Sequence, residues 1–93
     1  MDVLPFEPVE LVAVDPARNL HRRWRVAASR DLFGMLLIET DWGRTGTVGQ
    51  RRTRSFAEEA QALRYVRTLL ARRGRARQRI GVAYVPATVT PAA

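Results

Sequence analysis

Residues 55–73 carry the chain's one long amphipathic helical pattern, and the patterned segments before it have the two-residue period of β-strands. The helical stripe consists of apolar residues spaced three or four apart, namely Phe56, Ala60, Leu63, Val66 and Leu70, and it is widened by Ala57. Ser55 and Glu58 have the spacing of a capping box, so we expect the helix to begin near Ser55. Gly74 would stop it just after Arg73.

The segments ahead of this helix predict a sheet. Residues 9–14 form a first strand, and residues 23–28 alternate in the manner of a half-buried second one. Residues 33–40 are strongly apolar and predict an interior third strand, extended or ended by residues 41–44. We expect turns at Asp15–Asn19, at Ser29–Asp31 and around Gly46 and Gly49. The predicted fold is therefore α+β, an antiparallel sheet of about four strands with one long helix packed on one face.

Residues 50–54 fit a fourth strand that has no apolar face. Gln50, Arg52 and Arg54 would lie on one side, and Arg51 and Thr53 on the other. Two interpretations stay open, and they do not exclude each other. The segment is an edge strand whose charges oppose aggregation, or a basic surface that meets a ligand, or both.

The two ends of the chain carry weaker patterns. Residues 1–8 predict an extended lead-in, because prolines interrupt them. Residues 75–79 are basic and fit no single element, and residues 80–85 are a candidate for a last short strand. We expect one domain over residues 9–85 and a flexible tail over residues 86–93.

Composition excludes several classes of site. The 93 residues include no cysteine, which removes disulfides, thiolate metal sites and cysteine nucleophiles, and fits a reducing compartment. Apolar runs are far too short to span a membrane, so we expect a cytoplasmic protein. The lone His21 has no partner ligands for a metal, and no catalytic pattern is present, so we expect no cofactor and no enzymatic activity.

The net charge of +7 is unevenly distributed. Residues 1–41 hold five arginines and seven acids, a net of −2, whereas residues 42–93 hold eleven arginines and two acids, a net of +9. All sixteen cations are arginines, whose planar guanidinium groups bind phosphate and stack on rings. This asymmetry points to a polyanionic partner.

The tripeptide Trp42-Gly43-Arg44 leads into the glycine-rich turn of residues 45–50. It joins an aromatic ring that can stack on a base or sugar to a cation that can bind phosphate. Glycines beside them let a polymer backbone come close. Period two places Trp42 and Arg44 on the same side of the strand.

This stretch resembles the signature of the WGR domain, a small module found in poly(ADP-ribose) polymerases and in short bacterial proteins. The resemblance covers roughly residues 11–75 and includes three further features: Asp15-Pro16 and Asn19 before an aromatic strand, the turn Leu32-Phe33-Gly34, and the helix opening at Ser55. The chain departs from the family where a glycine-aromatic pair is usual, because two residues separate Gly81 from Tyr84. The catalytic domain of the polymerases has no counterpart here, so the resemblance does not imply ADP-ribosyl transfer.

Each candidate residue has a structural alternative. Trp42 is either a core residue or, as the resemblance implies, a ring that stacks on a terminal nucleotide. Arg44 either forms a salt bridge to Asp41 or Glu39 or contacts phosphate. Asn19 is first a turn former, and the resemblance adds a polar contact near the same surface. We expect Trp24 to be a core residue.

The function that these features favour is a non-enzymatic nucleic-acid-binding module for DNA ends or nicks. The predicted binding residues are Trp42, Gly43, Arg44, Asn19, Arg51, Arg52 and Arg54. The alternative is a protein-interaction adaptor that docks on an acidic partner. The character of the surface around Trp42 discriminates between them, because a continuously basic surface favours DNA and an acid-bordered apolar one favours a protein. The oligomeric state stays open.

Overall fold

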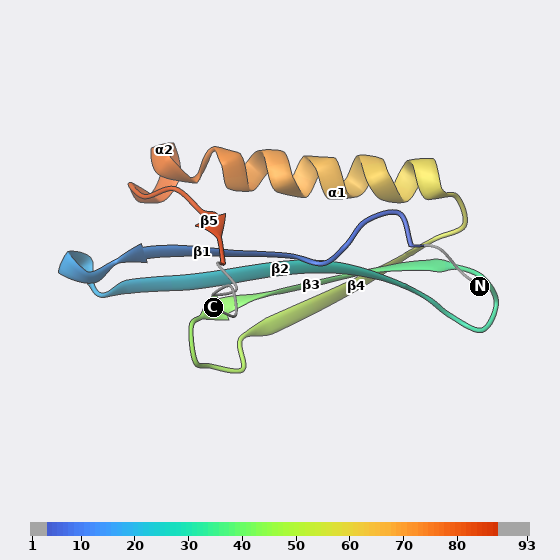
Figure 1. The fold of residues 1–93 in the computed structure, drawn as a ribbon, viewed down its shortest axis with the longest axis horizontal. Coiled ribbons are helices and arrows are strands. Elements are labelled where there is room, and N and C mark those ends of the chain that lie inside the picture. Colours follow the sequence, from blue (N-terminus) through green and yellow to red (C-terminus); the bar gives the residue numbers. More distant parts are fainter. Residues whose placement is uncertain (1–3, 88–93) are drawn as a thin grey trace, which may run out of the picture.

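Five antiparallel strands form one sheet in the described part of the chain, residues 4–87 of a computed structural model, and a long helix lies across one face (Figure 1). The elements are β1 (Val9–Asp15), a 3-10 turn η1 (Pro16–Arg18), β2 (Leu20–Arg30), β3 (Leu36–Arg44), β4 (Gln50–Phe56), α1 (Glu59–Gly74), α2 (Ala76–Ile80) and β5 (Val85–Pro86). The strand order is β4-β3-β2-β1-β5. The α+β fold is confirmed, with one strand more than predicted.

The alternation along the strands separates a buried face from a charged one. The core cluster under α1 consists of Trp24, Val26, Leu36, Ile38, Ala62 and Val66, with Phe6, Trp42, Tyr65, Leu69 and Tyr84 among the side chains packed around it. Trp24 is only 1% exposed, which confirms its predicted place in the core. The neighbouring residues on these strands point to the opposite face, where charged side chains pair with one another.

The turn between β2 and β3 lies later than predicted. Ser29 and Arg30 belong to β2, and the predicted strand from residue 33 begins instead at Leu36. The carboxylate of Asp31 accepts hydrogen bonds from the backbone N–H groups of residues 33 (2.8 Å) and 35 (3.0 Å), so the aspartate folds the chain locally. Leu32 and Phe33 are left 98% and 89% exposed at the tip.

The predicted capping box at the start of the helix is wrong. Ser55 lies in β4, where it pairs with Leu37, and α1 begins only at Glu59 after Glu58, which makes no side-chain capping bond. The β3–β4 ladder continues to Phe56, so strand pairing holds Ser55 in an extended conformation that no local capping motif overrides. Residues 50–54 do form a strand, and it lies exposed at the edge of the sheet, as one of the two interpretations expected.

The buried face of α1 differs from the predicted stripe. Ala62 and Val66 are buried, whereas Ala60 is exposed and Leu63 is half-buried. Tyr65 and Leu69 lie one turn apart on the same face as Val66. Their spacing fits a helical period just as well as the spacing of the predicted stripe does, so periodicity alone could not tell the two faces apart. The predicted outer residues Gln61, Arg64, Thr68 and Arg72 are all exposed.

The segment after α1 turns back toward the sheet. Gly74 is the last residue of α1, and the basic segment that fitted no single element contains the short helix α2. The predicted strand over residues 80–85 is reduced to Val85–Pro86, which pairs with β1 at the edge of the sheet. The segment predicted as a flexible tail, residues 86–93, therefore begins with a residue of the sheet, Pro86. Residues 88–93 lie outside the described part. No helix within residues 4–87 is long and apolar enough to cross a membrane.

Candidate functional site

A basic cleft of about 570 Å³ is lined by residues of η1, β2, the end of β3, the end of α1 and α2. Figure 1 shows η1 and α2 at the same end of the molecule. Its lining consists of six arginines, two aromatic residues and five others: Arg18, Arg22, Arg23, Arg44, Arg73, Arg79, Trp42, Tyr84, Asn19, Leu20, His21, Gly43 and Ile80. None of these residues is acidic. The cleft therefore concentrates positive charge between aromatic walls.

Trp42 lies in this cleft and also contacts the core. It is half-buried, it pairs with the buried Trp24 across the β2–β3 ladder, and it packs against the core cluster. The guanidinium carbon of Arg52 lies 6.0 Å from the centre of its ring. Part of the side chain therefore packs against the core, as one of the two interpretations expected, while part lines the cleft. Stacking on a nucleotide stays a prediction.

Arg44 lies on the same side of β3 as Trp42, as the period of the strand predicted. The salt bridge to Asp41 or Glu39 is not formed among the described residues. Instead, its guanidinium donates hydrogen bonds to both oxygens of Asn19, the backbone carbonyl and the side-chain Oδ1, each at 2.9 Å.

Asn19 is the turn former that the sequence predicted, and it also holds Arg44. Its φ of 53° is left-handed, a conformation that asparagine tolerates better than most residues, and its N–H donates to the carbonyl of Pro16 at 3.0 Å. This conformation ends η1 and presents both oxygens to β3.

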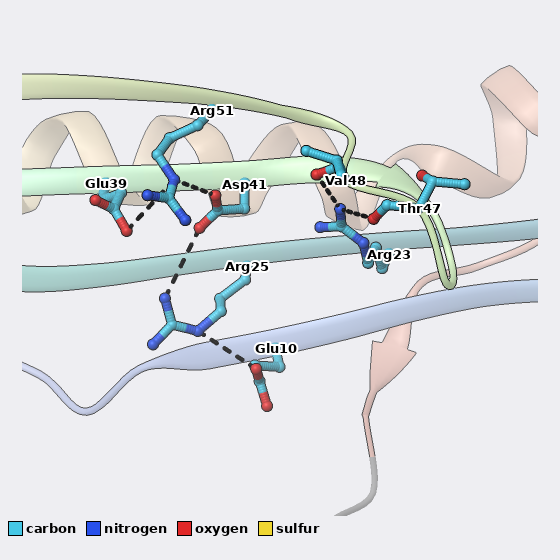
Figure 2. A network of polar contacts seen from close by, with 8 residues as sticks. All are labelled: Glu10, Arg23, Arg25, Glu39, Asp41, Thr47, Val48 and Arg51. Atoms are coloured by element: carbon cyan, nitrogen blue, oxygen red, sulfur yellow. Dashed lines mark hydrogen bonds and ion pairs between the residues drawn. The ribbon is translucent and has the colours of Figure 1, made fainter.

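The glycine-rich turn after Arg44 folds tightly against the strand that precedes it. A Cβ on Gly43 would come 2.8 Å from the Cα of Gly49, and a Cβ on Gly49 would collide with the carbonyl of Trp42. Both positions also have positive φ, so glycine is required there for two reasons. Arg23 completes the turn by donating two hydrogen bonds of 2.7 Å to the carbonyls of Thr47 and Val48 (Figure 2).

The three candidate arginines of β4 are separated by the strand's alternation. Arg52 and Arg54 lie on the α1 side, where the guanidinium carbon of Arg54 is 5.7 Å from the ring centre of Phe56 and 5.0 Å from that of Tyr65. Arg51 points to the opposite face. None of the three lines the basic cleft, so the structure brings together only part of the predicted set: Trp42, Gly43, Arg44 and Asn19.

The face turned away from α1 carries a cross-strand network of paired charges (Figure 2). The Nε of Arg51 bonds Asp41 at 2.7 Å, and this hydrogen bond, together with nearby carboxylates, raises the pKa of Arg51. Arg25 lies between Glu10 and Asp41, at 3.3 and 3.8 Å. Because cations and anions alternate here, this face offers much less net attraction for a polyanion than the basic cleft.

Several cleft residues were not among the predicted binding residues, because they come from distant segments. Arg73 of α1 lies over the rings of Trp24 (5.0 Å) and Tyr84 (5.9 Å), and burial lowers its pKa. Arg18 bonds Asp15 and the carbonyl of Ile80, each at 2.7 Å, which ties η1 to α2. The arginine excess after residue 42 was the available signal for Arg73 and Arg79, but nothing local marked Arg18 or Arg22.

His21 lines the cleft without metal-binding partners. No group of three or more histidine, cysteine, aspartate or glutamate side chains within residues 4–87 could hold a metal ion.

Comparison with known proteins identifies relatives of this chain. Residues 7–78 match the family described as the WGR domain. Over 71 residues the chain is 34% identical to an uncharacterized protein, y4dW, of Sinorhizobium fredii (strain NBRC 101917 / NGR234), an alignment that covers 74% of this chain and 35% of the relative. The chain thus spans about a third of the length of that relative. No solved structure gives a significant match.

Proposed function

Because the chain belongs to the WGR domain family, we propose that it is a non-enzymatic module that binds DNA ends or nicks through the basic cleft. The WGR domain is a non-catalytic module, and in poly(ADP-ribose) polymerases it serves as a nucleic-acid-binding module. The observation that carries the proposal is the lining of the cleft, where the arginines Arg22, Arg44 and Arg73 lie with two aromatic rings and no residue of the lining is acidic.

The arginines of the cleft supply the phosphate contacts in this proposal. Guanidinium groups bind phosphate oxygens through two parallel N–H bonds, and such contacts hold a duplex regardless of its sequence. Arg22 is exposed and forms no hydrogen bond or ion pair within residues 4–87, so its donors are available to a ligand. Arg44 uses one donor from each terminal nitrogen on Asn19 and keeps others for a phosphate.

The preference for ends rests on Trp42. Bases inside a duplex are stacked on both faces, whereas a terminus or a nick exposes a face of a base or sugar. The cleft presents part of Trp42 beside Arg44, so one terminal nucleotide would meet a ring and a cation together. Packing against the core holds the ring in place and reduces the entropy lost on binding.

A second candidate function is the protein-interaction adaptor, and one observation favours it. Leu32 and Phe33 are almost fully exposed in the β2–β3 turn, at the end of the sheet opposite the cleft (Figure 1). An exposed apolar pair of this kind is a common anchor for a protein partner. The surroundings of Trp42 favour DNA instead, because Glu39 and Asp41 lie on the other face of the sheet.

The proposal is tested by measuring affinities for blunt-ended, nicked and closed circular duplexes of the same sequence. We expect binding to all three at low salt, and tighter binding to the first two. Arg44→Gln should weaken binding, whereas Arg64→Gln, on the exposed side of α1, is the matched control. Absence of binding to any duplex at low salt would reject the proposal and leave the adaptor.

A further inference from the structure

A second, smaller hollow of about 210 Å³ lies between the sheet and α1. We refer to it as the inner pocket. Thr40 of β3 and Arg52 of β4 line it from the sheet, and Tyr65, Arg72 and Arg73 line it from α1. Trp42 and Arg73 line both this pocket and the basic cleft, so the two hollows share a wall.

Thr40, which lines this pocket, has a buried hydroxyl group without a partner. Thr40 is 4% exposed, and its Oγ1 makes no hydrogen bond within the described residues. The Nε of Arg73 is likewise buried and unpaired. Buried polar groups are nearly always hydrogen-bonded, so two unsatisfied donors around one hollow indicate a missing acceptor.

The positive charge around the inner pocket indicates that the missing acceptor is an anion. Arg52, Arg72 and Arg73 form no ion pair with any carboxylate in residues 4–87, and the acids nearest to Arg52 in the sheet point to the other face. Arg52 and Arg72 are exposed to solvent, whereas Arg73 is half-buried, and this burial lowers its pKa. A water molecule could accept from Thr40, but only an oxyanion would also carry a charge opposite to that of the three arginines.

We propose that the inner pocket binds one phosphate group, either as inorganic phosphate or as a phosphate monoester, through the hydroxyl group of Thr40 and the guanidinium groups of Arg52, Arg72 and Arg73. A tetrahedral oxyanion can accept from a hydroxyl and from several guanidinium donors at once. The inference rests on the inner pocket alone and does not depend on DNA binding in the basic cleft.

The test is the melting temperature of the whole chain during a titration with sodium phosphate, with sodium chloride holding the ionic strength constant. We expect a saturable rise, because a ligand that binds only the folded state stabilises it. Phosphate also stabilises proteins through exclusion from their surface, so the specific effect is the difference between variants.

Thr40→Val removes the hydroxyl group and keeps the shape of the side chain. Since the hydroxyl is unpaired, we expect this variant to fold with an unchanged or higher melting temperature in phosphate-free buffer, and to lose the saturable rise. Arg52→Gln should weaken phosphate binding by about tenfold or more. The matched controls are Thr53→Val and Arg64→Gln, whose side chains are exposed and lie outside the pocket, and both should respond as the original chain does.

A nucleoside monophosphate titrated in the same way separates the two sources of phosphate. A response to inorganic phosphate only would assign the pocket to the free ion, and a response to both would admit a monoester. An equal response of Thr40→Val and Thr53→Val to phosphate, or no saturable rise in the original chain, would overturn the inference. Arg44→Gln keeps the two proposals apart, because it should weaken DNA binding and leave the phosphate response intact.

Discussion

Arg44 donates hydrogen bonds to both oxygens of Asn19, a residue 25 positions earlier in the chain, and each bond is 2.9 Å long. The β1–β2 turn thereby orients the last residue of the Trp-Gly-Arg tripeptide. A guanidinium group held at two donors loses little further freedom when its remaining donors meet a phosphate. The left-handed turn at Asn19 is thus part of the candidate site.

Substitutions of Asn19 should separate its two roles. Asn19→Gly keeps the left-handed conformation and the carbonyl acceptor but removes Oδ1, whereas Asn19→Ala also introduces strain of about 1–2 kcal/mol. We expect the alanine variant to melt at a lower temperature and both variants to bind DNA more weakly. Thermal unfolding measures the contribution of the turn conformation, and DNA affinity measures the contribution of Oδ1. Equal melting temperatures of the glycine and alanine variants would show that the turn conformation contributes no stability.

Trp42→Ala should reduce the preference for DNA ends over closed circles by roughly 5- to 150-fold, since stacking of a base contributes about 1–3 kcal/mol. The melting temperature should fall as well, because Trp42 packs against the core. Trp42→Phe should retain part of the preference for DNA ends and part of the thermal stability. The stacking role is rejected if the melting temperature drops while the ratio of end to circle affinities stays constant.

Arg22→Gln should lower the slope of log affinity against log salt by about one, as expected when one phosphate contact is lost. Arg51→Gln is the comparison on the opposite face, where Asp41 already pairs with the arginine. Its slope should equal that of the original chain. The basic cleft is excluded as the DNA site if Arg51→Gln, rather than Arg22→Gln, changes the slope.

Val66→Asp should unfold the domain, because it places an unpaired carboxylate in a side-chain position that is 4% exposed. The cost should be several kcal/mol, comparable to the whole stability of a small domain. Arg67→Asp is the control one residue along, on the exposed side of α1. A cooperative transition at an unchanged temperature in Val66→Asp would mean that α1 does not pack on the sheet.

The sequence predicted those elements whose pattern is local. Period-two alternation around Trp24 identified a strand and its buried side. Residues 50–54 were expected to form a strand without an apolar face, for which a solvated edge was one of two interpretations. The start of α1 was not predicted correctly. Ser55 has the local chemistry of a cap, but its pairing with Leu37 in the sheet outweighs it, and no local pattern contains that pairing.

The amino-acid sequence by itself determined the α+β class, the Trp-Gly-Arg strand end with its glycine turn, and the excess of arginine in the second half of the chain. Only the tertiary structure decided which arginines line the same cleft. Alternation separates Arg51 from Arg52 although they are adjacent, while packing brings Arg18, Arg44 and Arg79 into one cleft from three distant segments. Neighbours in sequence share a backbone, but a site is formed by side chains that face the same space.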